Sequence, residues 1–413
     1  MNGADRAMKQ ELTYRYRLYP SQVQEKEILR IAEVARRYYN EILHEKTSVV
    51  LKTGIWKRKL IILEEMEDFA WEHGVDPCVL KYAVSEFDCA FGRFQKIHRT
   101  QVDQYKEKAV KRAEENPNSP LTEVDLKGYP EEKSLVAPRK SFTLSPALML
   151  WQDCAVMLPR IGWVKAQFHR LLPQDSRILN CTVLHKSTGK TYLLIKLSVE
   201  VEEKGQEEIP DEAIGIVFSP GKLAVRSDDV PVSVRHTDLE LDRQIRQAYQ
   251  TLRRRKPGSN RYDQQRRKLA RLYDKQVARR NDALHKAARE IVDTGKTIGV
   301  QEPAVKRMAE RHKKQDLDEI VKDEAWYSFY RKLQYKTALN GMQLRGISRA
   351  HPLWRICSTC HTLQDREQNT RVWLCPNGGT MCSKSGNAAR NVQRIVETEI
   401  QNWKAIPSPE GTS

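Results

Sequence analysis

Residues 213–218 read Ala-Ile-Gly-Ile-Val-Phe, an apolar run that stops at a turn formed by Ser219, Pro220 and Gly221. A short apolar run bounded by turn residues predicts a buried strand, and residues 222–226 predict its hairpin partner. Further along the chain we expect a buried strand at 296–300, a helix at 318–340, a strand at 342–347 and a last helix at 386–403. This half of the chain therefore alternates between strands and helices.

Upstream of that run, a strand and several helices precede a group of short strands. Residues 10–19 predict the first strand, and Ser21 with Gln24 predicts a capping box at the start of a helix. Amphipathic helices are predicted over about 56–73 and 77–113. Five short strands, typical of a small β barrel or sandwich, are predicted at 141–144, 155–158, 163–168, 178–186 and 191–201.

The composition is that of a basic globular protein. The 413 residues include 71 Lys+Arg and 54 Asp+Glu, for a net charge of +17, and 39% are hydrophobic. At about 150 residues per domain we expect two or three structural units with real cores. No apolar run approaches the roughly 18 residues of a membrane helix, which excludes a membrane span. We expect a soluble, cytoplasmic protein whose partners are polyanions.

Most of the net charge lies between Arg243 and Glu290, where 16 Lys/Arg and 4 Asp/Glu give a net +12. Two long basic helices are predicted over about 237–293, with a break at 257–259. Such a hairpin can simply be a solvated charged face. We favour a surface that follows a phosphate backbone, because arginine binds phosphates bidentately and stacks on bases. The arginines that indicate nucleic acid are Arg253, Arg254, Arg255, Arg266, Arg267, Arg279 and Arg280.

Four of the eight cysteines fall within 26 residues, a clustering typical of metal sites rather than of disulfides. Cys357 and Cys360 form a Cys-x2-Cys knuckle, Cys375 follows after 14 intervening residues, and Cys382 is the remaining nearby thiol. Structural Zn²⁺ needs four tetrahedral ligands, so we predict a zinc site of these four cysteines, with His361 as a weaker candidate. The alternative is a vestigial knuckle that has lost its zinc.

Five local strings occur in an order typical of one protein family. They are Arg17-Leu18-Tyr19-Pro20 with Gln24, Leu158-Pro159-Arg160-Ile161-Gly162-Trp163-Val164, Ser259-Asn260-Arg261, Arg280-Asn281-Asp282 with His285 and Lys286, and Asn387-Ala388-Ala389-Arg390-Asn391. Together they resemble the TnpB family, compact RNA-guided nucleases that insertion sequences carry and from which type V CRISPR effectors arose.

The resemblance implies an α+β multidomain fold. One part would be a wedge-type β barrel with an inserted helical recognition lobe. The other would be an RNase H-like α/β domain of the RuvC type with a zinc-ribbon-like insertion. The implied boundaries are 8–20 and 136–205 for the wedge, 21–115 for the lobe, 116–135 for a linker, 210–354 and 384–405 for the RuvC-like domain, 355–383 for the insertion and 406–413 for a tail.

RuvC-type nucleases hold two divalent metals with three carboxylates, and this chain has a different residue at each matching position. Val217 stands at the Asp of a motif resembling G-I-D-x-G, Gln301 at the Glu of the second motif, and Ser385 at the last Asp. Neutral side chains bind Mg²⁺ poorly, so we expect vestigial positions, no catalytic Mg²⁺ and no enzyme activity. Three alternatives remain. In the first, the alignment is shifted by one or two residues, which would supply one carboxylate, that of Glu302. In the second, other acidic residues bind the metals, and in the third the gene has decayed.

The cysteine cluster departs from the family as well. The resemblance implies a fourth ribbon cysteine at position 378, where this chain has Gly378. Cys382 would supply the fourth ligand if residues 376–381 fold back.

A TnpB-like protein without carboxylates can still bind a guide RNA and open matching DNA. We expect a TnpB-like nuclease-dead repressor, which occupies double-stranded target DNA beside a short flanking motif and competes with RNA polymerase at promoters. When bound, it would be associated with the bacterial nucleoid. The guide would lie on the wedge and the basic helices, including Ser259, Asn260, Arg261, Asn281, His285 and Lys286. Candidate base readers on the first helix are Arg36, Arg37, Tyr38, Tyr39 and Asn40. The alternative is that Tyr39 belongs to the core and that the two arginines are solvated.

Two other functions fit the same residues. A nuclease-dead type V CRISPR effector would use an array-derived guide, and only genomic context separates it from the first reading. A guide-independent basic nucleic-acid-binding protein would instead show sequence-neutral, strongly salt-dependent affinity without a preferred RNA.

Overall fold

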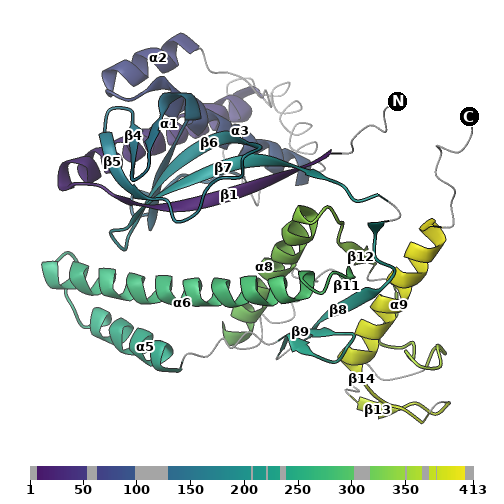
Figure 1. Cartoon of the computed structure of the whole chain (residues 1–413). Helices are drawn as coiled ribbons and strands as arrows, with labels where there is room; N and C mark the ends of the chain where they lie inside the picture. The colour runs from purple at the N-terminus through teal and green to yellow at the C-terminus, as the bar shows by residue number, and fades with distance from the viewer. Residues whose placement is uncertain are drawn as a thin grey trace, which may run out of the picture. The chain divides into compact units, whose positions relative to one another are not determined.

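The computed structural model describes residues 7–53, 63–97, 129–205, 208–219, 222–232, 239–301, 317–348, 351–364, 372–377 and 379–404. The chain divides into two compact units, one from Glu11 to Val199 and one that contains the remaining residues. Each unit has its own sheet (Figure 1). The predicted linker lies mostly, and the predicted tail entirely, outside the described residues.

A seven-stranded sheet forms the centre of the unit Glu11–Val199. Its order is β2-β6-β7-β1-β5-β4-β3, and the pairs β2–β6, β6–β7, β1–β5, β4–β5 and β3–β4 are antiparallel. The strands are β1 (Ala7–Tyr19), β2 (Arg139–Leu144), β3 (Leu150–Gln152), β4 (Ala155–Leu158), β5 (Gly162–Gln167), β6 (Ser176–Lys186) and β7 (Thr191–Glu202). All six strands predicted for this region are present, and β3 is an additional one.

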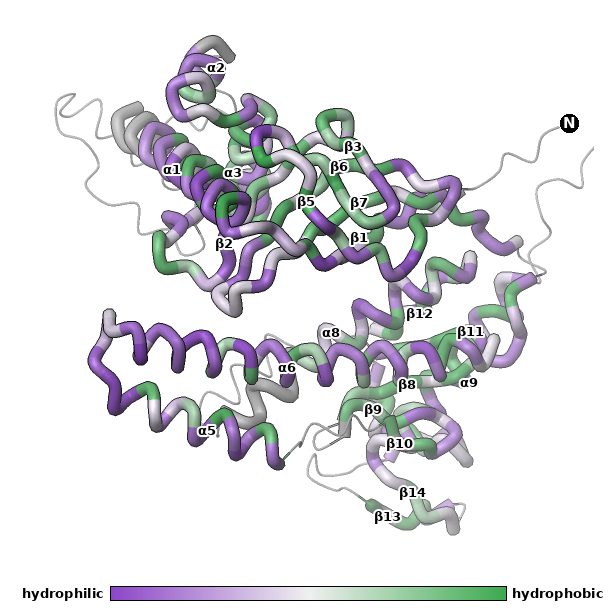
Figure 2. The backbone as a smooth tube through the Cα atoms, turned by 60° about the vertical axis from the view of Figure 1, so that its left-hand side comes forward, coloured by the Kyte–Doolittle hydropathy of each residue, from purple (hydrophilic) through white to green (hydrophobic). Residues whose placement is uncertain are grey.

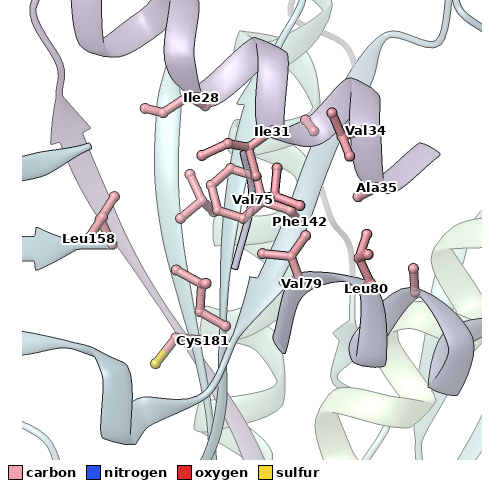
Figure 3. Packing of buried hydrophobic residues seen from close by; sticks show 14 of the residues in the cluster. Ile28, Ile31, Val34, Ala35, Val75, Val79, Leu80, Phe142, Leu158 and Cys181 are labelled. Atoms are coloured by element: carbon pink, nitrogen blue, oxygen red, sulfur yellow. The ribbon is translucent and has the colours of Figure 1, made fainter. Parts of the chain in front are cut away.

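Three helices accompany this sheet and share one hydrophobic core with it. They are α1 (Gln22–Thr53), α2 (Leu63–Glu72) and α3 (Pro77–Ile97). Figure 3 shows Ile28 of α1 and Leu80 of α3 in the same cluster as Phe142 of β2 and Cys181 of β6. The expected barrel and helical lobe are therefore not separated into two cores. The remaining parts of the helices predicted at 56–73 and 77–113 lie largely outside the described residues.

The start of α1 is fixed by the predicted capping box. The backbone N–H of Ser21 donates to Oε1 of Gln24 at 3.0 Å, and the backbone N–H of Gln24 donates to the Ser21 hydroxyl at 3.3 Å. The Gln24 amide also donates to the carbonyl oxygen of Trp163 at 2.8 Å. This one side chain ties the first family-like string to the second.

The second unit contains a five-stranded mixed sheet in the order β10-β9-β8-β11-β12. The pairs β8–β9 and β9–β10 are antiparallel, and β11 is parallel to both β8 and β12. The strands are β8 (Ala213–Ser219), β9 (Lys222–Arg226), β10 (Pro231–Val232), β11 (Thr297–Gln301) and β12 (Arg345–Ile347). The predicted hairpin and the two later strands are confirmed, whereas β10 was not predicted.

Helices cover both faces of this sheet. Those that pack on it are α6 (Asn260–Val292), α8 (Leu317–Leu339) and α9 (Lys384–Lys404), whereas α5 (Leu239–Arg253) packs on α6. Ile214 and Ile216 of β8 pack with residues of α6 and α8, while Val217 packs with residues of α9. Because successive side chains of a strand point to opposite faces, this central strand is apolar throughout.

The helices α5 and α6 form the predicted hairpin. Figure 2 shows that both are hydrophilic along most of their length. Leu241, Ile245 and Ala248 of α5 meet Leu269 of α6 in a small buried cluster that holds the two helices together. In the part of the chain that the structure describes, no helix is long and apolar enough to cross a membrane.

Candidate functional site

Two glycines allow α9 to lie directly on the sheet. A Cβ atom at Gly215 would lie 2.0 Å from the carbonyl oxygen of Ala389 and 2.6 Å from the backbone nitrogen of Gln393. A Cβ atom at Gly299 would lie 2.6 Å from Cγ2 of Val396. A larger residue at either position would therefore push α9 away from β8 and β11.

The three positions matched to catalytic carboxylates lie where β8, β11 and α9 meet. Val217 lies on the face of β8 that packs against α9. Gln301 is the last residue of β11 and shares its face with Gly299, and the parallel register of the two strands sets Gln301 beside Val217. Ser385 lies in the first turn of α9, and its hydroxyl is 2.9 Å from the hydroxyl of Ser219 at the end of β8.

The side chains at these positions do not fit a magnesium site. Val217 is 9% exposed and has no ligand atom. Gln301 offers only a neutral amide, and Ser385 exchanges a hydrogen bond with Ser219. Mg²⁺ in two-metal sites needs anionic oxygen ligands, which none of the three side chains supplies.

The acidic residues that follow β9 in the sequence form ion pairs with arginines. Nε of Arg226 donates to Oδ1 of Asp228 at 3.1 Å, and Asp229 forms an ion pair with Arg390 of α9. Glu302, the acid that an alignment slip would reach, lies outside the described residues. Within the described ranges, the one group of three ligand-type side chains close enough to share a metal ion consists of cysteines.

Three of the four predicted metal ligands converge. The sulfur atoms of Cys357, Cys360 and Cys375 all lie within 4.8 Å of one another, and those of Cys360 and Cys375 are 3.4 Å apart. Cys382 is not one of these three: it lies in β14 (Met381–Ser383), opposite Trp373 of β13 (Val372–Leu374), and packs in one buried cluster with Cys357 and Cys375. The fourth predicted ligand therefore lies outside the group of three converging sulfurs.

The cysteine trio suits a thiophilic metal in three of its four tetrahedral positions. The Thr362 hydroxyl, 3.0 Å from the Cys360 sulfur, is the main cause that lowers the pKa of Cys360 to about 6. Burial raises the pKa of Cys375. A thiolate is the form of cysteine that binds metal, so Cys360 is poised to ligate. His361, the weaker candidate, has an exposed side chain.

The string Asn387–Asn391 fastens the cysteine-bearing segment to α9. The side-chain amide of Asn387 donates to the carbonyl oxygens of Leu353 at 3.2 Å and Ile356 at 2.7 Å. The amide of Asn391, one turn later, donates to the same two oxygens at 2.9 and 2.7 Å. The backbone N–H of Ser358 in turn donates to Oδ1 of Asn387 at 2.7 Å. This family-like string therefore has a structural function.

The predicted basic residues of α5 and α6 are mostly solvent-exposed. Ser259 is the N-cap of α6 and accepts from the backbone N–H of Tyr262 at 3.2 Å. Arg255 donates to the carbonyl oxygen of Arg261 and so braces the turn. The exposed members of the predicted set are Arg253, Arg254, Asn260, Arg261, Arg266, Arg267, Arg279, His285 and Lys286, and the partly buried ones are Arg255, Ser259, Arg280 and Asn281.

The second half of α6 contacts α8 through polar groups. The Tyr335 hydroxyl is 3.1 Å from Nδ1 of His285, and Nζ of Lys332 is 3.5 Å from Oδ1 of Asn281. Burial, helped by the nearby charge of Arg280, lowers the pKa of Lys332. A cluster of like charges in this setting favours the approach of an anion such as a phosphate.

The proposed base readers on α1 are largely engaged within their own unit. Tyr38 and Tyr39 are 7% and 5% exposed and belong to the core. Arg36 donates to the carbonyl oxygen of Lys133 at 2.7 Å, and Asn40 accepts from the Lys133 backbone N–H at 2.9 Å. Arg37 is 58% exposed and pairs with Glu33 at 3.4 Å. The two tyrosines are therefore core residues, contrary to the expectation that they read bases.

The sequence did not reveal an aromatic and basic surface on the seven-stranded sheet. Tyr192 of β7 has the cationic groups of Arg15, Arg17 and Lys186 at 5.2, 5.1 and 5.4 Å from its ring centre. Arg17 also lies 5.4 Å from the ring of Tyr19, which is 48% exposed. Tyr16 and Leu18, which alternate with Arg15 and Arg17 on β1, point into the core. The two arginines therefore lie on the opposite face of the sheet. Only the pairing of distant strands brings them together.

Three family models match separate parts of the chain. The model described as "Probable transposase" matches residues 196–312, the Cas12f1-like TNB domain matches residues 326–392, and a helix-turn-helix domain matches residues 8–53. Together they cover nearly all of β1, all of α1, the region from β8 to β11, and the cysteine-bearing segment.

Two curated proteins are similar over nearly the whole chain. An RNA-guided DNA endonuclease of Streptomyces pristinaespiralis is 23% identical over 394 residues, which are 92% of this chain and 88% of that protein. The RNA-guided DNA endonuclease InsQ of Escherichia coli K12 is 21% identical over 404 residues, 93% and 92% of the two chains. Among solved structures, a Cas12f1 complex with guide RNA and target DNA has a TM-score of 0.42 at 13% identity, covering 94% of this chain and 99% of that one. A mini RNA-guided endonuclease, CRISPR-Cas phi3, has a TM-score of 0.40 at 9% identity, covering 95% and 92%.

Proposed function

The chain belongs to the TnpB family of transposon-derived RNA-guided nucleases, and from that premise we propose that it is a nuclease-dead member that acts as an RNA-guided transcriptional repressor. It binds a guide RNA and occupies complementary double-stranded DNA beside a short flanking motif. The guide lies on the wedge region and the basic helices, and residues 21–115 flank the RNA–DNA duplex.

The observation that carries this proposal is the chemistry where β8, β11 and α9 meet. An apolar side chain, an amide and a hydroxyl occupy the positions of the three carboxylates, at Val217, Gln301 and Ser385. The ion pair with Arg390 engages Asp229, whose Oδ1 would lie 2.8 Å from a Cβ atom at Gly386 in the first turn of α9. The mixed sheet, with three antiparallel strands followed by two parallel ones, supports the RuvC-like assignment of this unit.

Two surfaces support the retention of nucleic-acid binding. The exposed arginines of the α5–α6 hairpin offer a phosphate-binding face. The sheet face around Tyr192 offers a ring flanked by cations, on which an unpaired base can stack. The two similar curated proteins are named as RNA-guided DNA endonucleases, which supports RNA and DNA as the partners.

Repression follows from occupancy. In RNA-guided recognition the base pairs between guide and target read the sequence, and the protein reads a short flanking motif and the shape of the duplex. A protein that holds such an R-loop without cutting it obstructs RNA polymerase at a promoter. The regulated gene is then specified by the guide.

Purification with the native locus, followed by sequencing of the bound RNA, tests the guided function. The expected result is one dominant RNA with a structured scaffold encoded beside the gene and a short variable end. The variable end names the DNA to use in binding and reporter-repression assays. A smear of cellular RNA, with salt-dependent and sequence-neutral binding, would instead establish the unguided nucleic-acid binder.

A cleavage assay tests the absence of nuclease activity separately. The protein with its own RNA is incubated with matching DNA and Mg²⁺, and binding is measured on the same samples. We expect retarded but intact DNA. Mg²⁺-dependent cutting of the guided target by the wild-type protein would overturn the nuclease-dead proposal.

A further inference from the structure

Two turns in the cysteine-bearing segment repeat the same backbone hydrogen bonds. In residues 357–362, the first N–H donates to the sixth carbonyl oxygen at 3.1 Å and the fifth N–H donates to the first carbonyl oxygen at 2.9 Å. In residues 375–380, the same two bonds are both 2.9 Å long. The fifth residues, His361 and Gly379, both have a φ of 60°. The two segments therefore share the backbone arrangement of their first, fifth and sixth residues.

This correspondence assigns the ligand positions of the metal site. In a Cys-x2-Cys turn, the first and fourth residues direct their sulfurs to one metal ion. The first turn has cysteine at both places, Cys357 and Cys360, whereas the second begins with Cys375 and has Gly378 fourth in the sequence. Gly378 itself lies outside the described residues. The position of the missing thiolate is thus number 378 rather than 382.

Cys382 has a different place in the fold. It is the central residue of β14, paired across the hairpin with Trp373, and is 1% exposed. The strand pairing fixes its position, and its sulfur is not part of the group within 4.8 Å. Cys382 packs in one buried cluster with Cys357 and Cys375, but outside the group of three converging sulfurs. Cys382 is therefore a core thiol of the hairpin.

We propose that this chain binds one zinc-type ion through three thiolates only, Cys357, Cys360 and Cys375, and completes the coordination with a donor from outside the protein. Zn²⁺ prefers four ligands, and sites with three protein ligands take water or another small donor as the fourth. Such a site exchanges its metal more readily than a four-cysteine ribbon. The proposal stands on the cysteine geometry and is independent of the nuclease-dead function.

Cobalt substitution counts the thiolates directly. The full-length chain is stripped of metal under reducing conditions and titrated with Co²⁺, whose thiolate charge-transfer absorption grows with each bound sulfur. We expect Cys382→Ser to leave the band of the wild-type protein unchanged and Cys360→Ser to lower it by about a third, one ligand in three. A loss in Cys382→Ser equal to that in Cys360→Ser would overturn the proposal, as would the absence of any charge-transfer band. If the serine variant does not fold, the same Co²⁺ titration is made with Cys382→Ala.

A gain-of-ligand variant tests the assigned position. Gly378→Cys should restore the fourth thiolate, raise the cobalt band by about a third and tighten Zn²⁺ binding by more than about tenfold in a chelator competition. Cys154, exposed and in the other unit, provides a control for general thiol effects: Cys154→Ser should change neither readout. A Gly378→Cys variant that matches the wild-type band and affinity would refute the correspondence between the two turns.

Discussion

Restoring three carboxylates tests whether β8, β11 and α9 still converge on a two-metal site. The change is Val217→Asp, Gln301→Glu and Ser385→Asp in one protein. Val217 is 9% exposed, so Val217→Asp exchanges a buried apolar group for a carboxylate and should cost about 3–5 kcal/mol of folding free energy. Mg²⁺ should offset part of that loss, because the restored site exists only in the folded protein.

The size of the magnesium effect follows from linkage. At a free concentration about ten times Kd, Mg²⁺ would stabilise the triple variant by about 1.4 kcal/mol. For a unit of about 200 residues, this corresponds to a rise in Tm of about 3–6 °C. Scanning calorimetry of the triple variant and the wild type, each with and without Mg²⁺, measures the difference. The wild type should gain nothing comparable, since its three side chains are neutral.

A matched variant controls for added charge. Val225 pairs directly with Val217 across β8–β9 and is 8% exposed, so Val225→Asp carries a similar burial cost. However, β9 and β11 lie on opposite sides of β8, which places this carboxylate about 9.6 Å from residue 301 rather than about 4.8 Å. Combined with Gln301→Glu and Ser385→Asp, it should gain less from Mg²⁺. Equal gains in the two folded triple variants, or no gain in either, would refute the convergence of the three positions.

Three smaller predictions concern packing, capping and RNA binding. Gly215→Ala places a methyl group against the backbone of α9 and should destabilise that unit by about 1–3 kcal/mol. A Cβ atom at Gly92 would have nothing within 4 Å, so Gly92→Ala should stabilise its helix by about 0.5–1 kcal/mol. Thermal denaturation compares the two variants. Ser259→Ala removes the N-cap of α6 and should cost about 1 kcal/mol, seen as faster hydrogen exchange in its first turn. Tyr192→Leu should weaken binding of the co-purified RNA by about 1–3 kcal/mol without changing its salt dependence. Arg267→Gln should instead reduce the slope of log affinity against log salt concentration by about 1. An unchanged affinity for Tyr192→Leu would remove the sheet face from the binding surface.

Elements with a clear period could be predicted from the sequence, and those set by distant pairing could not. The strand at 155–158 was predicted with the bounds of β4, because its alternating side chains end at a proline turn. The strands β13 and β14 have three residues each, too few to show a period. Tyr192 and Arg15 meet only through the register of β1 and β7, which no local pattern encodes.

Two predictions at the candidate sites competed with other signals that were available in the sequence. Tyr38 and Tyr39 continue the spacing of Ile31 and Ala35 on α1, which places them on the buried stripe rather than among base readers. Counting thiols made Cys382 a ligand, although the x2 spacing of the first knuckle pointed to position 378 in the second. The hydrogen-bond repeat of the two turns favours position 378, because it orders ligand positions by backbone geometry rather than by the presence of sulfur.

The groups that occupy the positions of the carboxylates are compatible with one another when no metal is present. Three clustered carboxylates repel one another, and a metal ion normally offsets that repulsion. Here Val217 extends the apolar contact of β8 with α9, and the hydroxyls of Ser219 and Ser385 satisfy each other across the same junction. The ion pair between Asp229 and Arg390 joins the end of the β9 turn to α9. A junction closed by packing, a neutral hydrogen bond and an ion pair can hold β8, β9 and α9 together without Mg²⁺, which is the state that the proposed function by occupancy alone requires.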